Sequence, residues 1–257
     1  MKNDLCGTEE LTVRDDIAKL KELVDGSDNI VFFGGAGVST ESGIPDFRSV
    51  DGLYRQKFAY PPETILSHSF YVSHKAEFYD FYRAKMLALD ALPNAAHIKL
   101  AEWEKAGKLR AVITQNIDGL HQKAGSKEVL ELHGSVLRNY CERCGRFYGV
   151  EAVTGSEGVP KCVCGGDIKP DVVLYEEALD DNVVAKAVHY IRQADMLIIG
   201  GTSLTVYPAA GLVRYYRGHK LVVINKGNVG QDLGADLVID GPIGAIMSQI
   251  QLAGADT

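Results

Sequence analysis

A short apolar segment followed by three closely spaced glycines constrains the fold of this chain more than any other feature. Residues Ile30–Phe33 are β-prone, and the run is short enough for a fully buried strand. Gly34, Gly35 and Gly37 follow, and Ser39–Glu41 then has the composition of a helix start. A strand that passes through glycines into a helix start brings backbone N–H groups close to a phosphate. The sequence therefore predicts an anion-binding turn here.

The glycine spacing argues against a nicotinamide dehydrogenase. It runs Gly35-x-Gly37-x-x-Thr40, so the third glycine of the dehydrogenase fingerprint is missing. The acidic residue expected about 20 residues later, at the end of a second strand, has no candidate, because Asp51 falls in a predicted loop. Gly-x-Gly after a strand is a weak signal by itself, and a nucleotide site of another kind remains open.

Composition and charge narrow the possible partners. The chain has 257 residues, 46% of them hydrophobic, which suffices for one large domain or for one domain with a smaller insert. The net charge of −7, without a Lys/Arg-rich block, argues against direct nucleic-acid binding. No apolar run approaches membrane-spanning length, and Met1–Glu10 does not resemble a signal peptide, so we expect no membrane partner and a cytoplasmic location.

Four of the five cysteines form two close pairs, Cys141-x₂-Cys144 and Cys162-x-Cys164. In a cytosolic chain this clustering is more typical of a metal site than of disulfides. Four thiolates suit tetrahedral Zn²⁺ and leave no open coordination position, which predicts a structural zinc. The second pair is one residue shorter than usual, and Gly165 and Gly166 directly after it can relax the turn.

Strands alternate with helices along the chain, which predicts an α/β protein with a Rossmann-like, doubly wound parallel sheet. Further strands are expected at 109–114, 129–132, 196–200, 221–224 and 236–239, with an extended segment at 171–175. Helices are expected at 11–24, 69–89, 94–106, 183–191 and 208–217, and from 242 onward. We expect residues 1-40, 93-135 and 171-257 to form the Rossmann-like nucleotide-binding domain, and 41-92 (a helical insert) and 136-170 (a zinc-ribbon module) to form a smaller domain.

Polar residues follow several of these strands, and the carboxyl ends of parallel strands meet in one cleft. Gln115–Asp118 and Thr202-Ser203 follow two strands, and the alternative for each is an ordinary capped loop or helix start. His133 differs from the other six histidines, which we interpret as structural, because it ends an apolar strand and precedes Gly134. An imidazole there is a candidate proton acceptor, although a lone histidine is more often structural.

Taken together, these motifs resemble the sirtuin (Sir2) family of NAD-dependent protein deacylases. The matching segments are Gly35–Ser39, Ser42–Arg48, Thr114–His121, Leu132–Gly134, the four cysteines, Lys169–Val173 and Gly201–Ser203. They occur in the family's order over about residues 30–226. The chain has no long extensions beyond this core, which resembles the bacterial members.

The resemblance implies a role for each matched residue. His133 would be the general base, and Asn116 would order the catalytic pocket and its water. NAD would be bound by Ala36, Thr40, Phe47, Arg48, Gln115, Ile117, Asp118, Thr202, Ser203, Asn225 and Asp240. Zinc would be held by Cys141, Cys144, Cys162 and Cys164. Val173 and Val206 would pair through their backbones with an extended acyl-lysine peptide.

The implied activity is lysine deacylation, in which the acyl group passes to ADP-ribose and nicotinamide is released. Tyr82 is followed three residues later by Lys85, so the Tyr-x-x-Arg pair of members that prefer acidic acyl groups is incomplete, and acetyl or another apolar acyl group is favoured. Tyr175–Glu177 stands where many relatives have Phe-Gly-Glu, which could alter peptide preference. Alternatives are a protein mono-ADP-ribosyltransferase and a non-catalytic NAD- or peptide-binding module. The presence of Asn116, Asp118 and His133 favours deacylation.

Overall fold

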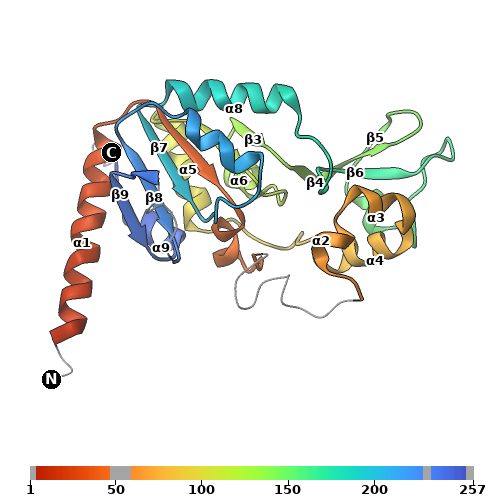
Figure 1. Ribbon diagram of the computed structural model, residues 1–257, viewed down its shortest axis with the longest axis horizontal. Helices are drawn as coiled ribbons and strands as arrows, with labels where there is room; N and C mark the ends of the chain where they lie inside the picture. Colours follow the sequence, from red (N-terminus) through yellow and green to blue (C-terminus); the bar gives the residue numbers. More distant parts are fainter. Residues whose placement is uncertain (1–3, 47–58, 228–232, 253–257) are drawn as a thin grey trace.

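A parallel sheet of six strands in the order β3-β2-β1-β7-β8-β9 forms the larger part of the molecule (Figure 1). The computed structural model describes residues 4–46, 59–227 and 233–252, with side chains from residue 14 onward. The strands in sheet order are β3 (Val129–Glu131), β2 (Leu109–Thr114), β1 (Ile30–Gly34), β7 (Met196–Gly200), β8 (Leu221–Asn225) and β9 (Leu237–Asp240). All neighbouring pairs are parallel, which confirms the predicted doubly wound α/β fold.

The central strand β1 is buried along its whole length because helices cover both faces of the sheet. Ile30 and Phe32 face one hydrophobic core, whereas Val31 and Phe33 face another. The helices of the first core are α1 (Asp4–Asp25), α5 (Ala95–Lys105) and α9 (Ile243–Met247). The second core is covered by α8 (Asp181–Gln193) and the 3₁₀ helix η4 (Ala209–Tyr215).

A second, antiparallel sheet lies at the opposite end of the molecule from α1 and β9 (Figure 1). Its strands, in the order β5-β4-β6, are β5 (Phe147–Tyr148), β4 (Gly134–Cys141) and β6 (Ile168–Val172). Short helices accompany it: α2 (Pro62–Ile65), α3 (His68–Ser73), α4 (Lys75–Lys85) and α7 (Glu151–Thr154). Aromatic residues of α3 and α4 share one core with Val136 of β4 and Val172 of β6, so the helical and cysteine-containing segments pack as one unit.

Three predicted elements differ from the observed ones. The predicted helix 69–89 is divided at His74, whose φ of −135° is non-helical and whose ring stacks on Phe70 at 4.7 Å. The predicted helix 208–217 is the 3₁₀ helix η4. After the glycines, the chain forms two 3₁₀ turns, Ala36–Val38 and Thr40–Ser42, and Gly43 ends the second with φ of 82°. The segment 36–42 therefore forms two tight turns directly after β1, in place of the predicted helix.

The strand β6 also begins earlier than the extended segment predicted at 171–175, because it pairs with β4, a strand that the sequence did not reveal. Across the described ranges, no helix combines the length and the apolar character needed to cross a bilayer.

Two fully buried histidines lie between the parallel sheet and its helices. The rings of His97 in α5 and His121 in α6 (Leu120–Ala124) have centroids 4.6 Å apart, and the His121 ring lies 6.2 Å from that of Phe32. Burial lowers the pKa of His97 to about 4 and that of His121 to about 3. Neither ring nitrogen of His121 has a hydrogen-bond partner among the described residues. Both imidazoles are therefore neutral in the folded protein at neutral pH.

Because these two histidines are buried and neutral, we expect the folded protein to lose stability in mild acid. The unfolded chain protonates them below about pH 6.5, whereas the folded chain does so only near pH 4 and pH 3, so the free energy of unfolding falls as the pH drops through this window. Between pH 7 and pH 5 each histidine contributes a loss of about 2 kcal/mol. Urea unfolding at both pH values measures this loss. In His121→Leu the loss should be smaller by that amount, and an unchanged pH dependence would contradict the prediction.

Candidate active site and metal centre

The glycine turns that follow β1 and β7 are in direct contact at the point where the strand order reverses. The Gly37 N–H donates to the Gly201 carbonyl at 2.8 Å. A Cβ on Gly37 would lie 2.8 Å from the Gly201 Cα, and one on Gly201, whose φ is 57°, would lie 2.3 Å from the Val38 nitrogen. Side chains are therefore excluded at both positions. Open α/β sheets bind ligands at this reversal point, where the glycine turns can approach a nucleotide.

Side chains after β2 connect the two turns. The backbone N–H of Gln115 donates to the Gly34 carbonyl at 3.0 Å, and its side-chain Nε2 donates to Thr202 Oγ1, also at 3.0 Å. Gln115 and Thr202, both predicted from the sequence to bind NAD, are thus brought together although they lie on different strand ends.

Ser39 completes a second polar group at the same edge of the sheet. Asn116 Nδ2 donates to Ser39 Oγ at 3.0 Å, and Ser39 Oγ donates to Asp118 Oδ2 at 2.6 Å. Asp118 also accepts from the backbone N–H of Leu120 at 2.9 Å. Ser39 and Asn116 are buried. No role was predicted for Ser39; its position at the end of the glycine turn was the signal that the sequence offered.

His133 has the tautomer that a general base requires. Its Nδ1 lies 3.0 Å from the backbone carbonyl oxygen of Gln115. A carbonyl can only accept, so Nδ1 carries the proton and Nε2 keeps its lone pair. Burial lowers the pKa of His133 below its usual value, although the hydrogen bond to Gln115 opposes this shift. The side chain is therefore a neutral imidazole with Nε2 available as a proton acceptor.

Backbone and ionic contacts hold the chain on both sides of His133. The Val173 N–H donates to the His133 carbonyl at 3.0 Å, so the segment predicted to bind peptide is joined directly to the predicted base. Arg138 of β4 pairs with Glu131 of β3 at 2.6 Å and with Asp171 of β6 at 2.8 Å. The two sheets are therefore tied together at His133.

The other predicted site residues lie further apart along this edge. Thr40 Oγ1 donates to the Gly37 carbonyl at 2.9 Å, and Ser203 Oγ lies 2.8 Å from Thr205 Oγ1. Asn225 and Asp240 pair in register at the ends of β8 and β9. Ala36 lies in the first 3₁₀ turn, Ile117 packs against the core of the helical segment, and Val206 precedes η4. Phe47 and Arg48 fall outside the described residues.

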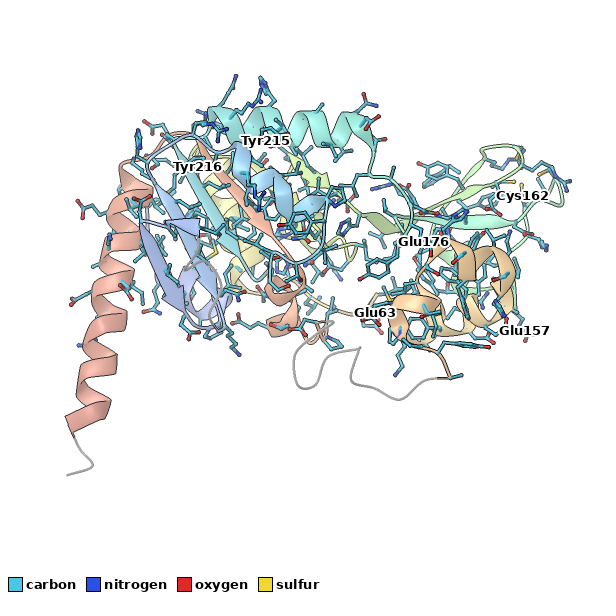
Figure 2. The ribbon with its side chains drawn as sticks, in the orientation of Figure 1. Glu63, Glu157, Cys162, Glu176, Tyr215 and Tyr216 are labelled. Atoms are coloured by element: carbon cyan, nitrogen blue, oxygen red, sulfur yellow. The ribbon has the colours of Figure 1, made fainter. Side chains whose placement is uncertain are left out.

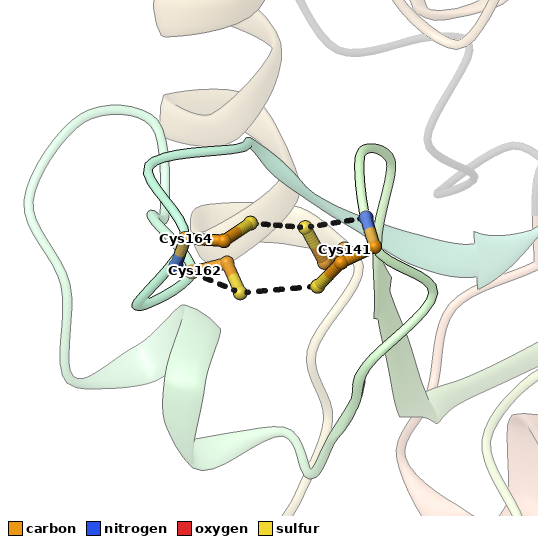
Figure 3. A group of neighbouring side chains, drawn as sticks. Cys141, Cys162 and Cys164 are labelled. Carbon is orange, nitrogen blue, oxygen red and sulfur yellow. Dashed lines mark hydrogen bonds between the residues drawn. The ribbon is translucent and has the colours of Figure 1, made fainter.

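The four clustered cysteines have the geometry of a zinc site (Figure 3). Their sulfur atoms all lie within 4.8 Å of one another, with Cys141–Cys164 at 3.5 Å and Cys144–Cys162 at 3.7 Å. A tetrahedron with Zn–S bonds of about 2.3 Å has S···S separations of about 3.8 Å. These distances are far too long for disulfides, and the cluster fits one zinc ion.

Two hydrogen bonds stabilise the sulfur of Cys162 in the second cysteine pair, which is one residue shorter than usual. The Cys164 N–H donates to Cys162 Sγ at 3.5 Å and the Tyr148 hydroxyl donates to the same sulfur at 3.0 Å. Together they lower the pKa of Cys162 to about 6, which favours the thiolate that binds metal. Figure 2 shows Cys162 at the far end of the antiparallel sheet from the parallel sheet, which fits a structural ion.

This geometry predicts one zinc per chain and a loss of stability without it. Cys162→Ser should lose most of its zinc and about 4 kcal/mol of stability, because three thiolates no longer close the site. Metal analysis and thermal unfolding measure both effects. Cys6→Ser, a cysteine outside the two pairs, is the control and should keep its zinc. A Cys162→Ser protein with full zinc content and unchanged stability would contradict the assignment.

The fold and the site define an α/β nucleotide-binding protein with an attached metal-binding module. The family model described as the Sir2 family matches residues 35–208. That range includes the glycine turn, His133 and all four clustered cysteines, and the chain belongs to the Sir2 family.

Close relatives are bacterial proteins of nearly the same length. A protein of Clostridium perfringens is 59% identical over 240 residues, which cover 92% of this chain and 98% of the relative. One of Clostridium acetobutylicum is 58% identical with the same coverage. Both are described as NAD-dependent protein deacetylases.

Solved structures agree with this assignment. A Sir2 complex with a p53 peptide and NAD⁺ has a TM-score of 0.80 and 40% identity, covering 90% of this chain and 95% of that one. A Sir2 structure with a deacetylated p53 peptide and 3′-O-acetyl-ADP-ribose has a TM-score of 0.83 and 38% identity, covering 91% and 96%.

Proposed function

We propose that this protein is an NAD-dependent protein lysine deacylase, with acetyl as the favoured acyl group. The observation that carries the proposal is the neutral His133 imidazole, whose Nδ1–H is bonded to Gln115 and whose backbone is bonded to Val173. A proton acceptor thus lies between the glycine turns and the segment proposed to bind peptide. The deacetylase descriptions of the relatives and the acetyl-ADP-ribose in a solved neighbour support the same reaction.

We propose that the NAD site is built along the carboxyl ends of the parallel strands. NAD supplies the ADP-ribose that accepts the acyl group and the nicotinamide that leaves. Ala36, Thr40 and Gln115 would hold the phosphates and ribose, since they lie at the contacting glycine turns, and Thr202 would hold the adenosine half. Ile117 and Asp118 would hold the nicotinamide amide, because the Asp118 carboxylate can accept from an amide N–H. Ser203, Asn225 and Asp240 would hold the adenosine half, and Phe47 and Arg48 keep the roles predicted from the sequence.

His133 would act through Nε2, which would take a proton from a ribose hydroxyl. The Gln115 carbonyl accepts from Nδ1–H in both protonation states of the ring, so it keeps the ring oriented and stabilises the imidazolium once formed. Asn116, held by Ser39, would order the pocket and its water. Hydrogen bonds within the chain therefore position both His133, which would accept the proton, and Asn116, which would order the water.

We propose that Val173 and Val206 line the two sides of an acyl-lysine peptide, which would pair through its backbone. The domain division predicted from the sequence is retained: residues 1-40, 93-135 and 171-257 for NAD, and 41-92 with 136-170 for the smaller domain. Separate cores in the two parts support the division, except that β6 crosses the boundary at residue 171 and its Val172 packs in the core of the smaller part. The net charge of −7 supports the absence of a nucleic-acid partner. A cytoplasmic location is supported by the arrangement of the four clustered cysteines, which suits a metal ion and not disulfides.

The first test is incubation with NAD and an acetyl-lysine peptide, followed by mass spectrometry. We expect nicotinamide, free lysine peptide and O-acetyl-ADP-ribose in equal amounts. His133→Ala should lower kcat about 10²–10⁴-fold, because the proton acceptor is removed. His219→Ala, an exposed histidine away from the site, is the control. A peptide that gains ADP-ribose instead indicates the mono-ADP-ribosyltransferase, and unconsumed NAD indicates a binding module.

The pH dependence provides a second test. Because burial lowers the pKa of His133, the base stays deprotonated below the usual histidine value of about 6.5. The acid limb of kcat/KM for the peptide should therefore lie below pH 6.5, with a plateau from there to neutrality. Initial rates at constant ionic strength measure the profile. An acid limb centred above pH 6.5 would mean that His133 is not the titrating base.

A further inference from the structure

Glu176 has an unusual backbone conformation in the loop after β6. Its φ is 75°, in the left-handed region that glycine adopts readily and a glutamate does not. Among the described non-glycine residues, only Leu204 shares a positive φ. A glutamate stays in this region when surrounding contacts hold it there. Figure 2 shows Glu176 where the two parts of the molecule meet.

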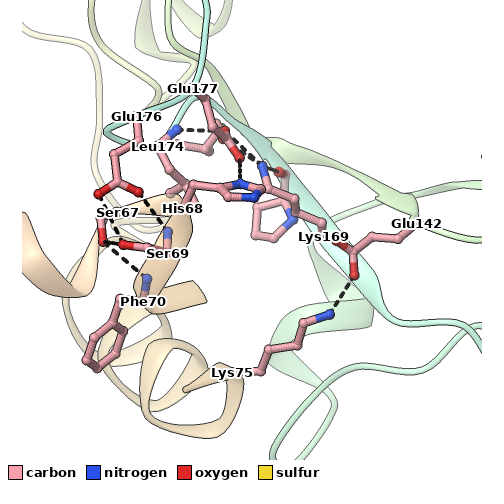
Figure 4. A network of polar contacts seen from close by, with 12 residues as sticks. Ser67, His68, Ser69, Phe70, Lys75, Glu142, Lys169, Leu174, Glu176 and Glu177 are labelled. Carbon is pink, nitrogen blue, oxygen red and sulfur yellow. Dashed lines mark hydrogen bonds and ion pairs between the residues drawn. The ribbon is translucent and has the colours of Figure 1, made fainter. Parts of the chain in front are cut away.

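Both carboxylate oxygens of Glu176 are engaged by one residue of α3 (Figure 4). The Ser69 N–H donates to Glu176 Oε2 at 2.9 Å, and Ser69 Oγ donates to Glu176 Oε1 at 3.0 Å. We refer to this pair of hydrogen bonds as the latch. It joins a loop next to the predicted base to a helix that lies more than one hundred residues earlier in the chain.

Neighbouring contacts extend the latch in both directions. The His68 N–H donates to the Tyr175 carbonyl at 2.9 Å, and the Tyr175 N–H donates to the Leu66 carbonyl at 3.0 Å. The Glu177 carboxylate accepts from the Leu174 N–H at 2.9 Å and lies 2.9 Å from His68 Nδ1 (Figure 4). The whole segment 174–177 is therefore fastened to residues 66–69.

This segment begins next to the catalytic centre. Val173, which directly precedes it, donates its N–H to the His133 carbonyl at 3.0 Å. The backbone from Val173 to Glu177 is thus fixed at one end by the residue proposed as the base and at the other by α3. A peptide that pairs with this backbone needs it to be ordered in advance, because ordering on binding would reduce affinity.

We propose that Glu176 is a positioning residue for the acyl-lysine peptide: its latch to Ser69 holds segment 173–177 in the conformation that the peptide pairs with. This proposal rests on the proposed function, and it concerns how the substrate site is held. A glycine at position 176 would adopt the same φ without strain but would lack the carboxylate. The protein therefore keeps a strained residue whose side chain supplies order to the substrate segment.

The decisive variant is Glu176→Gly, which removes the latch and relieves the strained φ together. The KM for an acetyl-lysine peptide should rise about five- to tenfold, because segment 173–177 would have to be ordered as the peptide binds. We expect kcat and the KM for NAD to stay within about twofold, because His133 and the glycine turns are untouched. Thermal stability should change little, because relief of the strained φ offsets the loss of the two hydrogen bonds. A purely structural role would instead lower stability and affect both substrates.

Two further variants distinguish loss of the latch from the loss of one negative charge. Glu63→Gln removes one exposed carboxylate from the first turn of α2 and should leave the peptide KM unchanged. Ser69→Ala keeps the backbone donor and loses the hydroxyl, so its effect should be smaller than that of Glu176→Gly. The double variant should match Glu176→Gly, because the two residues act through one contact.

Hydrogen exchange gives a readout that does not depend on turnover. In the zinc-loaded full chain without NAD or peptide, amides of residues 172–177 should exchange faster in Glu176→Gly than in the wild type or in Glu63→Gln. An active Glu176→Gly protein with an unchanged peptide KM, or unchanged exchange in this segment, overturns the proposal. If the wild type does not deacylate the peptide, the proposed function fails, and the exchange result alone decides whether the latch orders the segment.

Discussion

The contact between the two glycine turns is the constraint on which the rest of the site depends. Gly37 and Gly201 approach so closely that neither tolerates a side chain, and a backbone hydrogen bond joins them. This contact places the ends of β1 and β7 side by side at the reversal of the sheet. Gln115 can then reach Thr202, and Ser39 can reach Asn116 and Asp118. The positions of these polar side chains therefore depend on the positions of the two backbone turns.

The buried sheet explains why these turns hold their position. β1 directs Phe32 into one core and Phe33 into the other, so the strand is packed from both faces. The loops at its carboxyl end therefore start from a rigid base. The antiparallel sheet is joined to the parallel sheet by Arg138, which pairs with both Glu131 and Asp171. His133 lies at this junction, at the end of one sheet and the start of the other.

Local sequence patterns predicted the parallel sheet well because its strands are continuous apolar runs ended by glycine or polar residues. The strand at 196–200 is observed with the predicted bounds, and the helix predicted at 94–106 is observed as α5, capped by Asn94, whose side chain accepts from the Ala96 N–H. β4 was not predicted, because one part of it packs in the helical core and another part carries a zinc ligand, so no single period runs along it. The interruption at His74 depends on ring stacking that propensity does not encode.

Long-range side-chain contacts were the least predictable part of the site. Ser39 and Asp118 are 79 positions apart, and only the fold brings them together. The sequence shows that Tyr175–Glu177 differs from Phe-Gly-Glu. It does not show that Glu176 contacts Ser69, which lies more than one hundred residues earlier.

The hydrogen bonds of Glu176 join the segment proposed to bind peptide to the helical part of the chain. A glycine loop would respond to the peptide alone, whereas a loop held through Ser69 also responds to the position of α3. Val173, at the start of the same segment, donates its N–H to the His133 carbonyl, so the latch and the proposed base lie at opposite ends of one backbone segment. In the proposed arrangement, the helical insert would support the peptide side of the reaction, and the glycine turns would support the nucleotide side.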